Sequence, residues 1–160
     1  MKILFLLLSF LSFCFASQNF KETRHMDALN VDRQLFGNFE ITTDKMVVAY
    51  SKPNKQTITY YDDKISIQAN ETTKEYSFDK YPQAQYMGLA LKAIFEENYD
   101  ALEQFFTIKK EKNNRIYLSA KAGISDVIDS ITITKKSDKV IKNIFINMRN
   151  KDTISIETID

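Results

Sequence analysis

The sequence predicts an α+β protein in which one antiparallel sheet is combined with one amphipathic helix. Apolar and polar residues alternate with a period of two along most of the chain, which is typical of half-buried strands. Polar turn clusters separate these runs at intervals of about ten residues, a spacing that suits antiparallel hairpins. One segment, residues 82–98, carries the helical period instead. With 160 residues and no linker-like tract, the chain is expected to form a single domain.

Residues 1–16 have the features of a cleaved signal peptide. Lys2 supplies the positive charge, residues 3–15 are apolar, and small residues at Cys14 and Ala16 suit a signal peptidase. The apolar run is shorter than the ~20 residues that a membrane-spanning helix needs. We therefore expect cleavage after Ala16, export to the periplasm, and a mature domain over residues 17–160. That domain has no cysteine, since Cys14 is the one cysteine of the chain, so neither a disulfide nor a thiolate nucleophile is expected.

The strands are expected in the following order along the mature chain. The alternating runs lie near residues 20–29, 34–42, 45–51, 56–61, 64–68, 73–78, 105–111, 115–120 and 130–136, and a closing hairpin occupies residues 142–159. In that hairpin a polar turn at residues 149–152 separates two strands that each have one apolar face.

The helical segment has one apolar face. Pro82 suits a helix start, and Met87, Leu91, Ile94 and Phe95 follow at positions i, i+4, i+7 and i+8. We expect a helix that ends near residues 96–98, with a second short helix reaching toward residue 105. A helix of about fifteen residues is only ~22 Å long, so it covers only part of a sheet of about ten strands. The remaining apolar strand faces must close on themselves, pack on a second sheet or border an apolar hollow.

Catalytic motifs are scarce in this sequence. His25 is the one histidine, and Asp27 would share its strand face, so a His–Asp pair is conceivable. Three glycines rule out a phosphate-binding loop and a dinucleotide fingerprint. No metal-ligand spacing is present, and the formal charge of +1 argues against nucleic-acid binding. The sequence therefore predicts a non-enzymatic protein without cofactor or metal.

Several short motifs occur in an order that resembles a known family. They are a first strand with Phe20, Thr23 and Leu29, then Gly37-Asn38-Phe39, then an aromatic-x-x-proline segment at Tyr50 and Pro53, and last a turn at Asn150-Lys151-Asp152. In order and spacing they resemble the LolA-like family, the periplasmic carriers of outer-membrane lipoproteins. The resemblance extends over nearly all of the mature chain.

The resemblance implies a fold and a function that the residues alone leave open. It implies an incomplete antiparallel β-barrel, a strongly curved sheet with a helical lid on its concave face, in which an apolar surface takes up acyl chains. The cargo would be an acylated lipoprotein or a lipid. The carrier would be a monomer that works between an inner-membrane donor and an outer-membrane acceptor and needs no cofactor and no nucleic acid.

Strand alternation and the helix face together predict the residues that would line the lipid site. They are Phe39, Ile41, Met46, Val48, Tyr50, Ile58, Tyr60, Ile65, Ile67, Met87, Leu91, Phe95, Ile131, Ile133, Ile144 and Ile146. Two alternatives stay open at this point. The first is an envelope β-domain with a fully packed core that binds a protein partner. The second is an acyl-ester hydrolase that uses His25.

Overall fold

The computed structural model describes residues 17–137 and 140–159, so the predicted signal peptide lies outside the described residues. Six strands precede the helix: β1 (Ser17–Met26), β2 (Val31–Ile41), β3 (Met46–Lys52), β4 (Gln56–Tyr60), β5 (Lys64–Ala69) and β6 (Thr72–Ser77). Five follow it: β7 (Phe106–Glu111), β8 (Arg115–Ala120), β9 (Ile128–Ser137), β10 (Val140–Met148) and β11 (Thr153–Ile159). Between the two groups lie α1 (Pro82–Phe95) and a 3-10 turn, η2 (Tyr99–Leu102).

All strands belong to one antiparallel sheet that does not close. The order is β6-β5-β4-β3-β2-β1-β11-β10-β9-β8-β7, so the first and last strands of the domain pair at its centre. Each remaining neighbour pair is consecutive along the chain. The prediction of a single antiparallel sheet and one helix is confirmed for the described residues.

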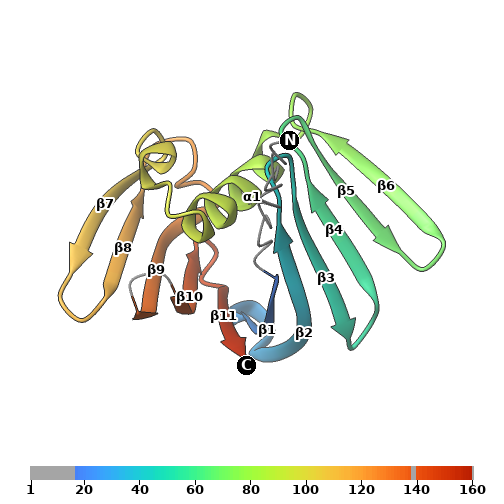
Figure 1. The fold of residues 1–160 in the computed structure, drawn as a ribbon, viewed down its shortest axis with the longest axis horizontal. Coiled ribbons are helices and arrows are strands. Elements are labelled where there is room, and N and C mark those ends of the chain that lie inside the picture. Colours follow the sequence, from blue (N-terminus) through green and yellow to red (C-terminus); the bar gives the residue numbers. More distant parts are fainter. Residues whose placement is uncertain (1–16, 138–139, 160) are drawn as a thin grey trace, which may run out of the picture.

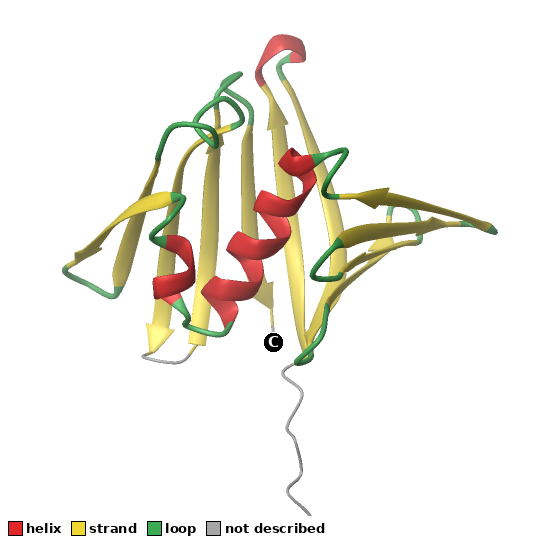
Figure 2. Cartoon of the chain, turned by 90° about the horizontal axis from the view of Figure 1, so that it is seen from above, coloured by secondary structure: helices red, strands yellow, loops and turns green. Residues whose placement is uncertain are grey.

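This strand order explains the path of α1. Strands β6 and β7 form opposite edges of the sheet, and α1 with η2 connects them along the chain. The connection must therefore cross the sheet, and Figures 1 and 2 show α1 running across its inner side. We call β2 to β6 (Val31–Ser77) the open wing and β7 to β10 (Phe106–Met148) the packed wing.

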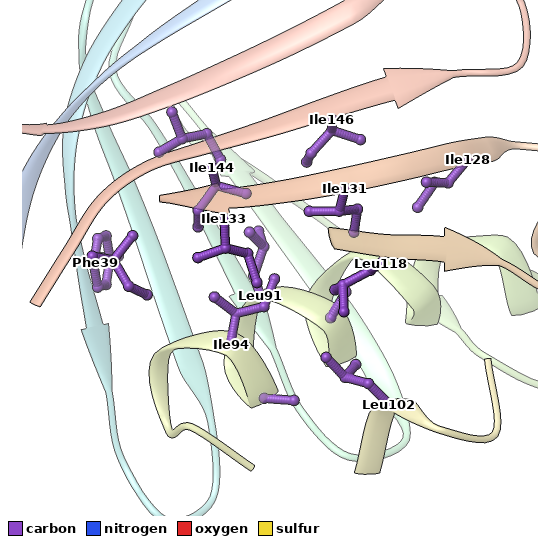
Figure 3. Packing of buried hydrophobic residues seen from close by; sticks show 14 of the residues in the cluster. Phe39, Leu91, Ile94, Leu102, Leu118, Ile128, Ile131, Ile133, Ile144 and Ile146 are labelled. Carbon is purple, nitrogen blue, oxygen red and sulfur yellow. The ribbon is translucent and has the colours of Figure 1, made fainter. Parts of the chain in front are cut away.

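The core lies where α1 and η2 cover the packed wing. Ile131, Ile133 and Ile144 are fully buried there, and Ile94 of α1 and Leu102 of η2 face them (Figure 3). The inner positions of these strands alternate with polar residues, because side chains point to opposite faces in turn. Ile131 and Ile133 are paired with Ile146 and Ile144 across β9 and β10, which makes this wall continuous.

The largest differences between predicted and observed boundaries lie at the first two strands, and smaller ones occur at the helix and at most other strands. The first strand ends at Met26 rather than at residue 29, because a 3-10 turn, η1 (Asp27–Leu29), closes at Asn30 in the left-handed conformation that asparagine tolerates. The second strand begins at Val31 rather than at residue 34. The helix ends at Phe95, and the second short helix is a single 3-10 turn.

Candidate functional site

The candidate site is a cavity between α1 and the open half of the sheet. It encloses about 70 Å³. Its walls come from the inner faces of β1 to β4, β10 and β11, and its roof comes from α1. The lining residues are Phe20, Glu22, Arg24, Phe39, Met46, Val48, Tyr50, Ile58, Tyr60, Met87, Leu91, Ile146, Ile154 and Ile156.

Strand alternation builds the wall of this cavity. Met46, Val48 and Tyr50 occupy every second position of β3 and therefore share a face. Val48 is paired with Ile58 of β4 and with Phe39 of β2, so the three side chains lie in one row across the sheet. The wall is apolar because the apolar side chains of these strands all point to the same side of the sheet.

Two glycines allow close packing around the cavity. A Cβ at Gly37 would lie 2.3 Å from the carbonyl oxygen of Ala49 and 3.0 Å from the ring of Phe20, so no other residue fits there without a shift. A Cβ at Gly88 would lie 2.1 Å from Cδ1 of Tyr60. The ring of Tyr60 therefore packs directly on the backbone of α1 at Gly88.

A buried polar cluster sits in this apolar wall. Glu22 is 3% exposed. Its carboxylate accepts a hydrogen bond from Nε of Arg24 and one of 2.7 Å from the hydroxyl of Tyr50. A second nitrogen of Arg24, Nη2, donates to the same hydroxyl over 3.3 Å. We call Glu22, Arg24 and Tyr50 the polar trio. The Glu22 carboxylate accepts from one charged donor, Arg24, and one neutral donor, Tyr50, and these two hydrogen bonds offset the cost of burying it.

The trio also indicates where the cavity opens. Phe20 and Glu22 are almost inaccessible, whereas the side chain of Arg24, next on the same face of β1, is 44% exposed. Solvent therefore reaches the cavity at its Arg24 end. This end lies beside η1, since Arg24 is two residues before the end of β1.

Burial shifts the ionisation of the tyrosines around the trio. Burial and the negative charge of Glu22 raise the pKa of Tyr60 to about 12. The same two causes raise the pKa of Tyr50 above its ordinary value. Burial alone would lower the pKa of Arg24, but the charge and hydrogen bond of Glu22 raise it overall. At neutral pH Arg24 therefore stays a guanidinium and Tyr50 a neutral phenol.

Nine of the sixteen residues predicted from the sequence line this cavity. They are Phe39, Met46, Val48, Tyr50, Ile58, Tyr60, Met87, Leu91 and Ile146. Whether they bind an acyl chain stays a prediction.

The other seven predicted residues do not line the cavity. Ile131, Ile133 and Ile144 are fully buried because α1 and η2 cover the packed wing. Phe95 packs on Phe39 with 4.0 Å between ring centroids, beside the cavity rather than in its roof. The remaining three lie elsewhere on the open wing and are Ile41, Ile65 and Ile67.

The cavity has five lining residues that were not predicted: Phe20, Glu22, Arg24, Ile154 and Ile156. Ile154 and Ile156 alternate with polar residues in the closing hairpin. This alternation was the signal in the sequence that could have identified them as lining residues. Glu22 and Arg24 share a strand face with Phe20, because they follow it at every second position. Charged residues on a strand, however, ordinarily indicate a face exposed to solvent. Nothing local in the sequence distinguishes a buried carboxylate from an exposed one.

The predicted His25–Asp27 pair is not formed. Nδ1 of His25 lies 2.7 Å from a carboxylate oxygen of Asp32, its partner across the β1–β2 hairpin, whereas Asp27 belongs to η1. The His25–Asp32 pair is largely exposed, with 34% and 65% of the two side chains accessible. It lies outside the cavity lining and borders no described hollow that would hold a substrate.

Two further properties of the described residues bear on the site. Within residues 17–137 and 140–159, three or more His, Cys, Asp or Glu side chains nowhere gather in an arrangement that could hold a metal ion. In the same part of the chain, α-helices lack the length and apolar character needed to cross a membrane.

Comparisons with known proteins find similarity in structure. No model of a protein family matches the chain, and no curated protein matches it. Among solved structures, the chain resembles the Mycobacterium tuberculosis lipoprotein LppX, with 10% sequence identity and a TM-score of 0.37 over 91% of this chain and 86% of that one. A TM-score this low carries no conclusion about function, so the resemblance to LolA-like proteins stays a prediction from sequence.

Proposed function

We propose that this protein is a non-enzymatic carrier that takes up an acyl chain of a lipid or lipoprotein between α1 and the open wing. The observation that supports the proposal is the cavity itself: an apolar wall, a helix as roof and one polar cluster at the accessible end. Pockets that bind apolar ligands combine these features.

The size of the cavity sets a condition on this function. An engineered protein cavity of ~150 Å³ binds benzene, and the present cavity has about half that volume. An acyl chain of a dozen carbons therefore requires α1 to move away from the open wing. Met87 and Leu91 are the side chains of α1 that would separate from the wall, since both line the cavity.

The energies favour a tilt of α1 over its complete release. Leaving the sheet would expose Leu91, Ile94 and several half-buried side chains, at ~1.5–3 kcal/mol for each large one. A dozen methylene groups contribute only about 10 kcal/mol before the cost of ordering the chain. A tilt that separates Met87 and Leu91 but keeps Ile94 on the packed wing costs a few kcal/mol, and the acyl chain replaces the contacts that are lost.

The cellular setting is part of the proposal. Cleavage after Ala16 would release the domain into the periplasm, where it would pass cargo from an inner-membrane donor toward an outer-membrane acceptor. The intact mass of the protein purified from the periplasm should match a chain that starts at Ser17. Lipid extracted from the same sample and analysed by mass spectrometry would identify the cargo.

A disulfide between α1 and β4 tests the proposed movement. A Cβ at residue 88 would lie 2.7 Å from Cγ of Tyr60, so it is at most about 4.2 Å from Cβ of that residue, because one C–C bond spans ~1.5 Å. Disulfides need a Cβ–Cβ distance of ~3.5–4.5 Å. The pair Tyr60→Cys and Gly88→Cys, with Cys14→Ser, is therefore close enough for a disulfide that would pin α1.

The readout is binding of laurdan, a neutral fluorophore with a twelve-carbon acyl chain whose emission shifts in apolar surroundings. The reduced double variant should bind laurdan, and the oxidised form of the same protein should not. Ile58→Trp, which fills the cavity, should weaken binding, while Thr59→Trp on the opposite face of β4 should not. Equal binding by the oxidised and reduced forms would contradict the proposal.

The alternative of a packed β-domain that binds a protein partner has its own support. On the packed wing Ile131, Ile133 and Ile144 are fully buried beneath α1 and η2, as in a closed core (Figure 3). If neither wild type nor the reduced variant binds laurdan, this alternative replaces the carrier proposal.

A further inference from the structure

A second hollow adjoins the cavity at Tyr50. It is a groove of about 310 Å³ whose lining includes Arg33, Leu35, Tyr50, Lys55, Gln56 and Ala69. Tyr50 lines both the groove and the apolar cavity, so the two hollows share a wall. The cavity and the groove are therefore neighbours on either side of Tyr50.

Strand register places the groove on the same face of the sheet as the cavity. Arg33 is the partner of Arg24, and Leu35 is the partner of Glu22, across β1 and β2. Gln56 is the partner of Tyr50 on β3 and of Ala69 on β5. Partners across an antiparallel pair point to the same side. The inner face thus changes from apolar under α1 to polar beyond Tyr50.

The charge of this inner face is positive. Arg24, Arg33 and Lys55 line the two hollows, and Glu22 is the one acidic residue among the described side chains that line them. Glu22 is already engaged by Arg24. Arg33 and Lys55 are exposed, and neither forms an ion pair with any side chain in the described part of the chain. Two cations without an ion-pair partner therefore line the groove next to the apolar cavity.

We propose that the ligand is a single-chain amphiphile with an anionic head group, whose chain enters the cavity under α1 while its carboxylate or phosphate lies in the groove at Arg33 and Lys55. This inference rests on the proposed carrier function and specifies its cargo. Glu22 acts as a positioning residue, since its hydrogen bonds hold Arg24 and Tyr50 at the junction of the two hollows. Each guanidinium or ammonium group near an exposed anion favours it by about fivefold in affinity at low salt.

The test is competition against laurdan by three ligands with the same twelve-carbon chain. They are dodecanoate, dodecyl phosphate and 1-monododecanoylglycerol, each used below its aggregation concentration. Wild type should bind both anions at least about fivefold more tightly than the neutral glyceride. The preference should shrink as NaCl is raised, because exposed charges are screened. A difference between the two anions would separate carboxylate from phosphate as the natural head group.

Variants that remove one positive charge test which residues cause the preference for anionic ligands. Arg33→Gln and Lys55→Gln should each lower anion affinity about fivefold and reduce the preference for the anions over the glyceride by a similar factor. Arg115→Gln and Lys112→Gln, exposed residues on β8 and in the turn before it, are the matched controls and should change neither.

The outcomes separate this inference from the proposed function. Absence of laurdan binding to wild type overturns both. Laurdan binding with equal competition by the anions and the glyceride overturns the anionic head group and leaves the carrier standing. The salt dependence of wild type needs no variant, so the inference can be tested even if a substitution disturbs folding.

Discussion

The two wings of the sheet have similar alternating sequences but different interiors. On the packed wing, Ile131 and Ile133 alternate with polar residues and are fully buried. On the open wing, Ile58 of β4 alternates in the same way and is only half buried. Of the eleven large side chains with the lowest exposure, Met46 is the one that lies on the open wing. What differs is the covering: α1 and η2 fill the space over the packed wing, whereas on the open wing α1 rests on Tyr60 of β4 and leaves a cavity beneath Met87 and Leu91.

The difference shows that alternation specifies which face a side chain takes but not whether that face is filled. Filling depends on the segment that crosses the sheet, and that segment is one helix of 14 residues. A short helix covers one wing well or both wings poorly. Here it packs on the wing that also receives η2, and the open wing is left with a cavity that a flexible ligand could enlarge.

The largest expected effect comes from matched isoleucine truncations on the two wings. Ile131→Ala should cost ~2–5 kcal/mol of unfolding free energy because the packed wing leaves a void that cannot collapse. Ile58→Ala should cost about 1 kcal/mol or less, since its side chain is half exposed to a cavity already present. Urea unfolding followed by circular dichroism measures both. Equal losses would show that the two wings are packed alike.

High pH should destabilise the protein through Tyr60. The folded-state pKa of Tyr60 is about 12, above the ordinary value of 10, because burial and Glu22 disfavour the phenolate. The folded state therefore keeps the phenol proton longer than the unfolded chain does. This contribution, ~2–3 kcal/mol at most, is complete below pH ~10 and is lost as the pH rises toward 12.

The measurement is unfolding free energy from pH 8 to 12 for wild type and Tyr60→Phe. The variant cannot ionise at this position, so its stability should fall less steeply above pH 10, while the two proteins should differ little at pH 8. Parallel curves over the whole range would show that Tyr60 ionises at its ordinary pH and that the wall of the cavity is wet.

Gly88→Ala tests the contact between α1 and the open wing. The added methyl group would collide with Tyr60, so we expect a loss of ~1–3 kcal/mol despite the better helix propensity of alanine. In a Tyr60→Ala background the collision is absent, and the same substitution should stabilise by up to ~1 kcal/mol. The double-mutant cycle measures this coupling. Additive effects would mean that α1 does not rest on Tyr60.

Sequence reasoning identified the sheet, the helix and nine cavity residues, because these follow from local periodicity and helix-face spacing. It could not divide the isoleucines between the wings, since Ile133 and Ile58 have the same local pattern. It also missed the polar trio. Glu22 and Tyr50 are 28 residues apart in the sequence and meet because β1, β2 and β3 lie side by side in the sheet. Their hydrogen bond therefore depends on the register of these strands and not on a local sequence motif.

The smallest expected effects come from two lysines at opposite sides of the end of α1. Nζ of Lys92 donates to the carbonyl oxygen of Thr43 over 3.1 Å at an exposed site next to the open wing. Lys135 on the packed wing is paired with Glu97 and lies 5.6 Å from the ring centre of Tyr99, with only 13% of its side chain exposed. Lys92→Met should cost less than ~0.5 kcal/mol of unfolding free energy. Lys135→Met should cost about 1 kcal/mol, because this variant loses an ion pair and a cation–π contact at a less exposed site.

Urea midpoints of the two variants, measured side by side, check which substitution costs more. If Lys92 proved the more costly of the two, the end of α1 would be held mainly by the open wing, and a tilt that pivots on the packed wing would no longer be the cheapest way to admit a chain.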